Sequence, residues 1–351
     1  MGKINVAVIF GGYSSEYEVS LQSAHAIITN LNKEKYEPIL IGITKTGKWL
    51  RYQGDVDHIR NNTWYEDDSN CYSVVISPDR YENKLIEFKK DGTVQITVID
   101  VIFPILHGRY GEDGTLQGMA ELSGIPIVGC NTLSSALCMD KDKAHQLVAM
   151  TGIKAPSSVV FTRNCSQTEI FEGTNQLSYP LYVKPVKAGS SHGITKVYQK
   201  KELSNAIKEA FLYDEEVIIE ENIEGFEVGC AILGNRDLTI GLVDEVEVPG
   251  GFFDYKEKYS LELSQIYVPA RIDQELEKKV KEAAVTIYRT LGCSGLARVD
   301  MFLTPDNEIV FNEVNTFPGF TTHSRYPNMM KGIGLEFADL LDKLIQVGLE
   351  K

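Results

Sequence analysis

The sequence predicts an α/β protein of two or three domains, and three observations support this prediction. Strand and helix patterns alternate through the first third of the chain, which is typical of a parallel sheet covered by helices. The length of 351 residues is more than one small core needs. Hydrophobic residues make up 43% of the chain and charged residues 24%, the balance of an ordinary soluble globular protein.

The N-terminal domain is expected at residues 1–133 and should hold a parallel α/β sheet. Apolar runs predict strands at Ile4–Phe10, Pro38–Ile43 and Ile99–Ile105, and apolar spacing predicts a helix at Ser20–Leu31. Gly11-Gly12 and His107-Gly108 follow two of these strands, and ligands of such sheets lie outside the carboxyl ends of the strands. This domain should therefore contribute to a binding site. The polar stretch from Gly54 to Gly92 is interpreted as surface decoration with a hairpin.

Two further units are expected at residues 134–220 and 221–351. The central unit has a predicted helix at Met139–Met150 and a strand that ends in Val217–Glu220. The last unit has predicted strands and helices at Val228–Leu233, Thr239–Val248, Gln274–Leu291, Gly295–Leu303 and Glu308–Glu313, followed by a C-terminal helix. Between them, the loop at about 249–262 has no clear strand pattern.

Charge and cysteine usage exclude several classes of protein. The net charge of −14, without a basic stripe, argues against a nucleic-acid binder. The six cysteines form no C-x-x-C pair, which indicates reduced thiols in a cytoplasmic protein rather than disulfides or a zinc site. The first apolar run is too short for a signal peptide, and no run approaches the roughly 20 residues of a membrane span.

The segment from Gly42 to Trp49 nearly spells a phosphate-binding P-loop. Trp49 stands where a serine or threonine should hold magnesium, and no helix pattern follows. A hairpin turn is the better interpretation. The first strand is not followed by G-x-G-x-x-G either, so a dinucleotide enzyme has little support.

A glycine- and serine-rich loop runs from Lys184 to Gly193. Its backbone N–H groups could surround an anion, with Lys184 supplying positive charge at the end of a strand. A plain turn is an equally good interpretation of this segment alone. Lys141, at the start of a predicted helix, could reach the same anion.

The strongest local signal is a set of carboxylates in two apolar strands. Asp300 lies in one predicted strand, and Glu313 and Asn315 end the next, two residues apart and so on one face. Buried carboxylates need a cation, and an all-oxygen set of this kind suits magnesium. Arg298 shares the face of Asp300, so an ordinary arginine–carboxylate cluster is the alternative.

Together these motifs resemble the ATP-grasp D-alanine–D-alanine ligases. The resemblance includes Gly11–Ser20 with Glu16, Leu106–Gly114 with His107, the glycine-serine loop, Phe252–Tyr259, Arg298–Asp300 and Asn312–Gly319, in this order along nearly the whole chain. It implies an ATP-grasp fold, in which two α+β units hold ATP, behind the N-terminal domain. The family is usually dimeric, so a homodimer is implied by resemblance alone.

The resemblance also implies an ATP site between the central and C-terminal units. Lys141, Lys184 and the lid residue Lys258 should contact phosphates, Glu220, Glu221 and Ile223 the adenine, and Glu227 the ribose. Asp300, Glu313 and Asn315 should hold two Mg²⁺ ions, with Mn²⁺ as a substitute. The loop at about 249–262 would then be a lid that orders on binding.

The implied reaction forms a D-alanyl phosphate from D-alanine and ATP, and the amine of a second D-amino acid then displaces phosphate. The substrate residues would be Glu16 on the first ammonium, Ser190 and Tyr259 in the same network, Ser324 on the second carboxylate, and His107 near substrate as a positioning group. Arg298 and the Gly319 N–H would stabilise the oxyanion.

Two departures from the housekeeping pattern concern the second substrate. Arg325 stands where D-alanine enzymes commonly carry an apolar residue, and Phe253 stands where tyrosine is frequent. The retained Lys258-Tyr259 pair favours an amine nucleophile over D-lactate. Arg325, held by an acidic residue such as Asp244, could donate to a serine hydroxyl, and such a pocket discriminates well.

The sequence hypothesis is therefore a D-alanine–D-serine ligase similar to the VanG-type vancomycin-resistance enzymes. It would make D-alanyl-D-serine for peptidoglycan precursors, with a housekeeping D-alanine–D-alanine ligase as the alternative. A non-catalytic nucleotide-binding module would not explain Glu16 and Ser324 in separate domains. A biotin-carboxylase-like enzyme should lack the N-terminal motif with Glu16.

Overall fold

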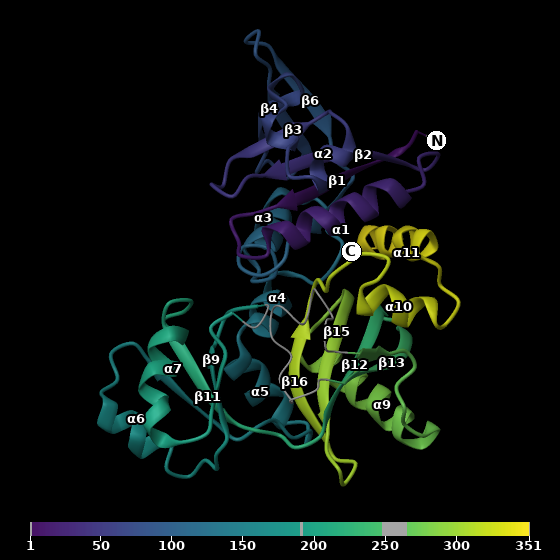
Figure 1. Cartoon of the computed structure of the whole chain (residues 1–351). Helices are drawn as coiled ribbons and strands as arrows, with labels where there is room; N and C mark the ends of the chain where they lie inside the picture. The colour runs from purple at the N-terminus through teal and green to yellow at the C-terminus, as the bar shows by residue number, and fades with distance from the viewer. Residues whose placement is uncertain (1, 190–191, 248–264, 351) are drawn as a thin grey trace.

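The computed structural model describes residues 2–189, 192–247 and 265–350. Three sheets organise the chain (Figure 1): a seven-stranded sheet in the N-terminal domain, a four-stranded sheet in the central part and a five-stranded sheet in the C-terminal part. The mixed α/β architecture predicted from the sequence is confirmed. Among the described residues, no helix is long and apolar enough to cross a membrane.

The N-terminal sheet has the strand order β6-β5-β4-β3-β2-β1-β7. Its strands are β1 Ile4–Gly11, β2 Tyr36–Ile43, β3 Trp49–Tyr52, β4 Cys71–Ile76, β5 Lys84–Phe88, β6 Val94–Val98 and β7 Val101–Ile105. Its helices are α1 Tyr17–Asn30, α2 Val56–Arg60, the short 3-10 turns Trp64–Glu66 and Asp68–Asn70, and α3 Thr115–Ser123.

Only part of this sheet is parallel. β1 pairs in parallel with β2 and β7, as the sequence predicts, whereas β2 through β6 pair antiparallel. Short connections, which suit antiparallel pairs, join β2 to β3, β4 to β5 and β5 to β6, whereas the segment between β3 and β4 carries α2 and the two 3-10 turns. The segment from Gly54 to Gly92, interpreted as surface decoration, therefore adds β4 and β5 to the sheet. Its hairpin is confirmed.

β1 is apolar and buried from Val6 to Phe10 because helices cover both of its faces. Val8 and Phe10 belong to a core with α1 and the last described helix, α11 (Phe337–Leu349). Ala7 and Ile9 face the other way, into a core with α3. Figure 1 shows α11 beneath α1, where the chain returns from the C-terminal part to the first domain. Gln346 of α11 donates to the Tyr36 hydroxyl at 3.1 Å, across 310 residues of sequence.

The central part contains helices α4 Thr132–Met139 and α5 Lys141–Ala149 and a four-stranded sheet of order β10-β9-β11-β8. The strands are β8 Ser158–Thr162, β9 Leu181–Pro185, β10 Thr195–Val197 and β11 Glu216–Glu221. Helices α6 Gln167–Gly173 and α7 Leu203–Ala210 and the 3-10 turn Lys200–Glu202 pack with it. β9 and β11 are antiparallel, which sets Lys184 opposite Ile218 and next to Glu220.

The C-terminal part has an antiparallel sheet of order β14-β13-β12-β15-β16. Its elements are β12 Phe226–Gly234, β13 Thr239–Glu247, β14 Gln265–Tyr267, α9 Gln274–Thr290, β15 Gly295–Leu303, β16 Ile309–Asn315, α10 Arg325–Lys331 and α11. In Figure 1 the four- and five-stranded sheets stand on either side of α4 and α5. The predicted strand Gly295–Leu303 is confirmed at both ends.

Candidate active site

Glu16 lies where β1 passes into α1, at the predicted ligand edge of the first sheet. It is 6% exposed and fits between two glycines: a Cβ added to Gly108 would lie 2.2 Å from its Oε2, and one added to Gly189 would lie 2.7 Å away. Only glycine lets both backbones approach this carboxylate. A pocket of about 460 Å³ opens beside Glu16 and is lined also by Ser14, Arg109 and Gly189. A small zwitterion with a free ammonium suits this place.

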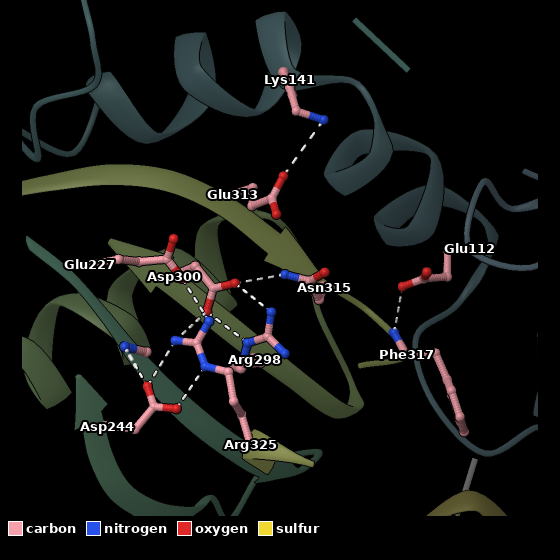
Figure 2. Close-up of polar contacts among 11 residues, drawn as sticks. Glu112, Lys141, Glu227, Asp244, Arg298, Asp300, Glu313, Asn315, Phe317 and Arg325 are labelled. Carbon is pink, nitrogen blue, oxygen red and sulfur yellow. Dashed lines mark hydrogen bonds and ion pairs between the residues drawn. The ribbon is translucent and has the colours of Figure 1, made fainter. Parts of the chain in front are cut away.

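The two lysines expected at phosphates each lie close to a carboxylate. Lys184, on β9, donates to Glu220 Oε2 at 2.5 Å. Lys141 opens α5, donates to the Ala188 carbonyl at 2.9 Å and stands 3.6 Å from Glu313 Oε2. Figure 2 shows the Lys141 ammonium pointing from the helix toward Glu313. Lys184 thus pairs within the four-stranded sheet, and Lys141 reaches from α5 to β16 of the five-stranded sheet.

Glu220 is almost completely buried on β11. Burial opposes its ionisation, but Lys184, His145 and Lys141 together outweigh that effect and lower the pKa of Glu220. His145, which the sequence reasoning missed, stands 3.9 Å from Glu220 and bonds the Asn312 carbonyl at 2.8 Å. Its signal was the spacing from Lys141, since residues four apart share one helix face.

The other residues expected at the adenine lie at the end of the same strand. Glu221 accepts a hydrogen bond from the Ser178 N–H at 2.8 Å, and Ile223 is partly exposed two residues later.

Arg298, Asp300 and Asn315 come together on adjacent strands, as the sequence predicts. Arg298 donates to both oxygens of Asp300, from Nε at 2.7 Å and from Nη2 at 2.6 Å, and Asn315 donates to Asp300 Oδ2 at 2.8 Å (Figure 2). Burial disfavours the charge on Arg298, but the neighbouring carboxylate raises its pKa. These contacts form the arginine–carboxylate cluster that is the alternative for these residues.

Glu313 completes the oxygen donors on this face. β15 and β16 set it opposite Asp300, with Asn315 two residues further along. Carboxylate and amide oxygens from neighbouring strands are ligands that suit Mg²⁺, so the residues present fit such an ion. The described residues contain no cluster of three or more His, Cys, Asp or Glu side chains able to hold a metal, and here the third donor is an amide.

Arg325, at the start of α10, is held by carboxylates of the five-stranded sheet (Figure 2). Its Nε and Nη2 donate to the two oxygens of Asp244 at 2.7 and 2.8 Å, and its Nη1 donates to Glu227 at 2.6 Å. Nη2 also lies 3.6 Å from Asp300 Oδ1. Burial disfavours the charge on the guanidinium, but these carboxylates raise its pKa. The pairing of Arg325 with Asp244 is as expected, and the partnership with Glu227 was missed.

Gly229 leaves room for this arrangement. A Cβ there would lie 2.5 Å from Arg325 Nη2 and 2.6 Å from Asp244 Oδ1. Its N–H also donates to Asp244 at 2.9 Å. The close approach of backbone and guanidinium therefore depends on the missing side chain.

Ser324 and Gly319 lie on the turn between β16 and α10. The Ser324 hydroxyl accepts from the Thr321 N–H at 2.9 Å, and a Cβ on Gly319 would lie 3.4 Å from it. The turn therefore brings these two predicted substrate groups side by side.

His107 lies in the loop after β7 and is 4% exposed. Burial lowers the pKa of His107 to about 4, so the imidazole is neutral at physiological pH. Its Nδ1 lies 3.0 Å from the Phe317 carbonyl. Glu112, in the same loop, accepts from the Phe317 N–H at 2.9 Å (Figure 2). The sequence reasoning did not single out Glu112, whose signal was its place in a glycine-rich loop after a strand.

Four predicted site residues are not placed. Ser190, Phe253, Lys258 and Tyr259, and with them the predicted lid, lie outside the described residues.

Two family models match the chain. The D-ala D-ala ligase N-terminus model covers residues 5–130, and the D-ala D-ala ligase C-terminus model covers residues 147–346.

Individual relatives match over nearly their whole length. The D-alanine–D-alanine ligase of Caldicellulosiruptor bescii is 44% identical, over all of this chain and 96% of its own. The vancomycin C-type resistance protein VanC1 of Enterococcus gallinarum is also 44% identical, over 98% of both chains. The crystal structure of VanG D-Ala:D-Ser ligase from Enterococcus faecalis superposes with a TM-score of 0.92 at 59% identity, covering 99% of this chain and 100% of that one.

Proposed function

Because the chain belongs to the D-alanine–D-alanine ligase family of ATP-dependent ligases, we propose that it joins D-alanine to D-serine. The product, D-alanyl-D-serine, would enter peptidoglycan precursors and lower the affinity of vancomycin for them. The observation that carries this choice is the buried Arg325, held by Asp244 and Glu227 at 2.6–2.8 Å. Similarity to the VanG D-Ala:D-Ser ligase supports it.

The first step activates D-alanine. Its carboxylate oxygen attacks the γ-phosphorus of ATP, the bond to the β-phosphate oxygen breaks, and D-alanyl phosphate and ADP result. Glu16 is placed to pair with the ammonium of this D-alanine, beside the pocket of about 460 Å³. Ser190 and Tyr259 would extend the same network.

The nucleotide would lie between the four- and five-stranded sheets. Lys141 and Lys184 are now neutralised by Glu313 and Glu220, and phosphate oxygens would share or replace these partners. Glu220, Glu221 and Ile223 would face the adenine, Glu227 the ribose, and Lys258 would close over the phosphates. Mg²⁺ held by Asp300, Glu313 and Asn315 would neutralise the charge that moves onto the phosphates.

The second step forms the amide bond. The amine of the second substrate attacks the acyl carbon and an oxyanion forms; its collapse breaks the bond to the phosphate oxygen, inorganic phosphate leaves, and the nitrogen releases a proton to solvent. Arg298 and the Gly319 N–H are the proposed oxyanion donors. For this role Arg298 must keep Asp300 as a partner while turning one N–H toward the oxyanion, and a guanidinium has enough donors for both. Ser324 would bind the carboxylate of the second substrate.

Selection of serine follows from the donors on Arg325. Three of its N–H groups already serve Asp244 and Glu227, which fixes the plane of the guanidinium. A remaining N–H is available to a hydroxyl oxygen. D-alanine would leave that buried donor without a partner, so the pocket should favour D-serine, with Phe253 closing it.

A competition assay tests this proposal. The enzyme is given ATP, magnesium, D-alanine and D-serine at equal concentrations, and the dipeptides are separated by mass. D-alanyl-D-serine should predominate in the wild type, and Arg325→Leu should shift the product toward D-alanyl-D-alanine by about 10-fold or more. Arg289→Leu, an exposed arginine of α9, is the matched control.

The housekeeping alternative is favoured by the similarity to the Caldicellulosiruptor bescii D-alanine–D-alanine ligase. Exclusive formation of D-alanyl-D-alanine by the wild type would replace the serine proposal with this one.

A further inference from the structure

The turn from Thr316 to Thr321 joins β16 to the second-substrate residues and is held by side chains of the N-terminal domain. Glu112 Oε1 accepts from the Phe317 N–H at 2.9 Å, and His107 Nδ1 lies 3.0 Å from the Phe317 carbonyl. Ser23 Oγ, on α1, accepts from the Phe320 N–H at 3.2 Å. Three backbone groups of one short turn are thus bound by residues from a different domain.

The contact with Phe317 shows which imidazole nitrogen carries a proton. The Phe317 carbonyl can only accept, so His107 Nδ1 carries a proton and donates it. His107 Nε2 lies 3.2 Å from Ser23 Oγ. Burial keeps the ring neutral, so Nε2 is an acceptor, and the Ser23 hydroxyl, which accepts from the Phe320 N–H, donates to it. The Phe320 N–H thus donates to Ser23, the Ser23 hydroxyl donates to His107, and His107 donates to the Phe317 carbonyl.

Glu112 uses both of its oxygens on backbone N–H groups. Oε2 accepts from Gly108 at 2.9 Å while Oε1 accepts from Phe317. The Glu112 carboxyl group therefore fastens its own loop to the turn. His107 binds the carbonyl of Phe317 and Glu112 binds its N–H. These two bonds restrict rotation of the peptide groups on both sides of Phe317.

The same loop is bound to the first-substrate site. The Ser14 hydroxyl donates to the His107 carbonyl at 2.9 Å and accepts from the Glu16 N–H at 3.1 Å. A continuous set of hydrogen bonds therefore leads from Glu16, through the His107 loop, to Phe317.

Gly319 lies between Phe317 and Phe320, whose backbone groups make these hydrogen bonds. Its neighbours Phe317, Pro318 and Phe320 are buried, whereas Gly319 itself is partly exposed. Within the part of the chain that the structure describes, its N–H donates no hydrogen bond. The direction of this N–H is consequently set by the backbone on either side of it.

We propose that Ser23, His107 and Glu112 form a clamp that aims the Gly319 N–H at the reacting carbonyl of the first substrate. They are positioning residues, and the inference rests on the proposed oxyanion role of Gly319. One oxyanion donor is worth about 10²–10³-fold in rate, and a displacement of about 1 Å can cost about 10²-fold. Because the clamp residues also bind the loop next to Glu16, the acyl group and its oxyanion donor are held in one frame.

Glu112→Gln is the first test. An amide of the same shape has one acceptor oxygen, so it can serve Gly108 or Phe317 but not both. We expect kcat to fall by about 10–100-fold, with the KM for the first D-alanine and the Kd for ATP changed by less than about 2-fold. Affinity for a phosphinate dipeptide analogue of the tetrahedral state should fall by a similar factor as kcat. Glu121→Gln is the matched control, because Glu121 accepts the Thr132 N–H at 2.9 Å on the outer side of α3.

Two variants of His107 give a test that does not depend on Glu112. Asparagine can place its amide near the position of Nδ1 and still donate to Phe317, whereas glutamine reaches toward Nε2. His107→Asn should therefore keep at least about 10-fold more kcat than His107→Gln. Equal rates for the two variants would overturn the clamp, as would unchanged kcat and analogue affinity in Glu112→Gln.

Different results would contradict the clamp and the proposed ligase activity. A wild type that releases no phosphate with D-alanine and D-serine contradicts the proposed function. A wild type that makes the dipeptide while Glu112→Gln matches it in kcat contradicts only the clamp. A variant that loses kcat, ATP affinity and thermal stability together also contradicts the clamp, because that pattern belongs to a structural role.

Discussion

Two buried polar regions lie at the candidate active site, and they are built in opposite ways. At the end of the N-terminal sheet, His107 is uncharged, and it and Ser23 make hydrogen bonds to backbone groups. In the five-stranded sheet, two arginines and the carboxylates around Arg325 and Asp300 form one network of ions. The first region fixes the path of the chain. The second holds charges close together, and under the proposed function phosphate, metal and substrate would change their arrangement.

The energetic cost of the two regions differs accordingly. Removing ions from water costs several kcal/mol each, and their mutual attraction only partly offsets it. Neutral hydrogen bonds to buried backbone groups avoid that cost and add about 0.5–1.5 kcal/mol each. The ionic network is therefore expected to serve function at the expense of stability.

Asp244→Ala should give the largest effect. Asp244 is fully buried and makes two hydrogen bonds to Arg325, so its loss leaves part of a buried cation without a partner. The free energy of unfolding should fall by about 3–5 kcal/mol in urea titrations. Lys278→Ala, in an exposed pair with Glu282, is the control and should change it by less than about 0.5 kcal/mol.

Removing both ions of the Arg325–Asp244 pair tests whether the ionic network supports the fold. Asp244→Leu with Arg325→Leu removes both ions, so most of the lost stability should return while the serine preference does not. If the double variant is as unstable as Asp244→Ala, the ionic network supports the fold after all.

His107, in the neutral region, should make the free energy of unfolding depend on pH. The pKa of His107 is lowered by burial to about 4 in the folded state, against about 6.5 in the unfolded chain. Between these values only the unfolded chain binds the proton, so stability is complete above pH 6.5 and falls as pH drops toward 4. The loss from this group reaches about 3 kcal/mol.

His107→Asn removes that titrating group. Its free energy of unfolding, measured in urea from pH 7.5 to 4.5, should decline less steeply on acidification than that of the wild type. Parallel curves would show that His107 is not held neutral.

Gly229→Ala should give the smallest of these effects. The added methyl group would lie 2.5 Å from Arg325 Nη2, but the guanidinium is the end of a flexible side chain and can shift. We expect a loss of about 1–3 kcal/mol and a lower ratio of D-alanyl-D-serine to D-alanyl-D-alanine. Gly118→Ala on α3 is the control, since its nearest neighbour is 3.7 Å away. An unchanged product ratio would separate the position of Arg325 from serine selection.

The sequence predicted the ionic region better than the neutral one. Arg298, Asp300 and Asn315 stand at fixed spacings on two strands whose apolar runs are plain, so their shared face follows from the strand period. Glu112 acts through backbone atoms of Phe317, 205 residues away, and such a contact has no pattern in the side chains. The same holds for Glu227, which meets Arg325 from 98 residues away.

The fold was predictable where one face or both faces of an element were apolar. β1 and β15 match their expected positions, because burial leaves a continuous hydrophobic run. The stretch from β4 to β6 was harder to recognise as part of the sheet. β6 is exposed along most of its length, and Val94, Ile96 and Val98 are about half exposed. Partial burial gives a weaker signal than the core strands do.

The return of α11 to the first domain has a consequence for synthesis on the ribosome. Leu340 and Leu344 share a core with Val8 and Phe10, and Gln346 reaches Tyr36 across 310 residues. At about 5–20 residues per second, the face of α1 that α11 covers stays open for roughly 15–60 s after it has been made. During that time an apolar surface of the nascent N-terminal domain is left uncovered, and chaperones would be expected to bind it there.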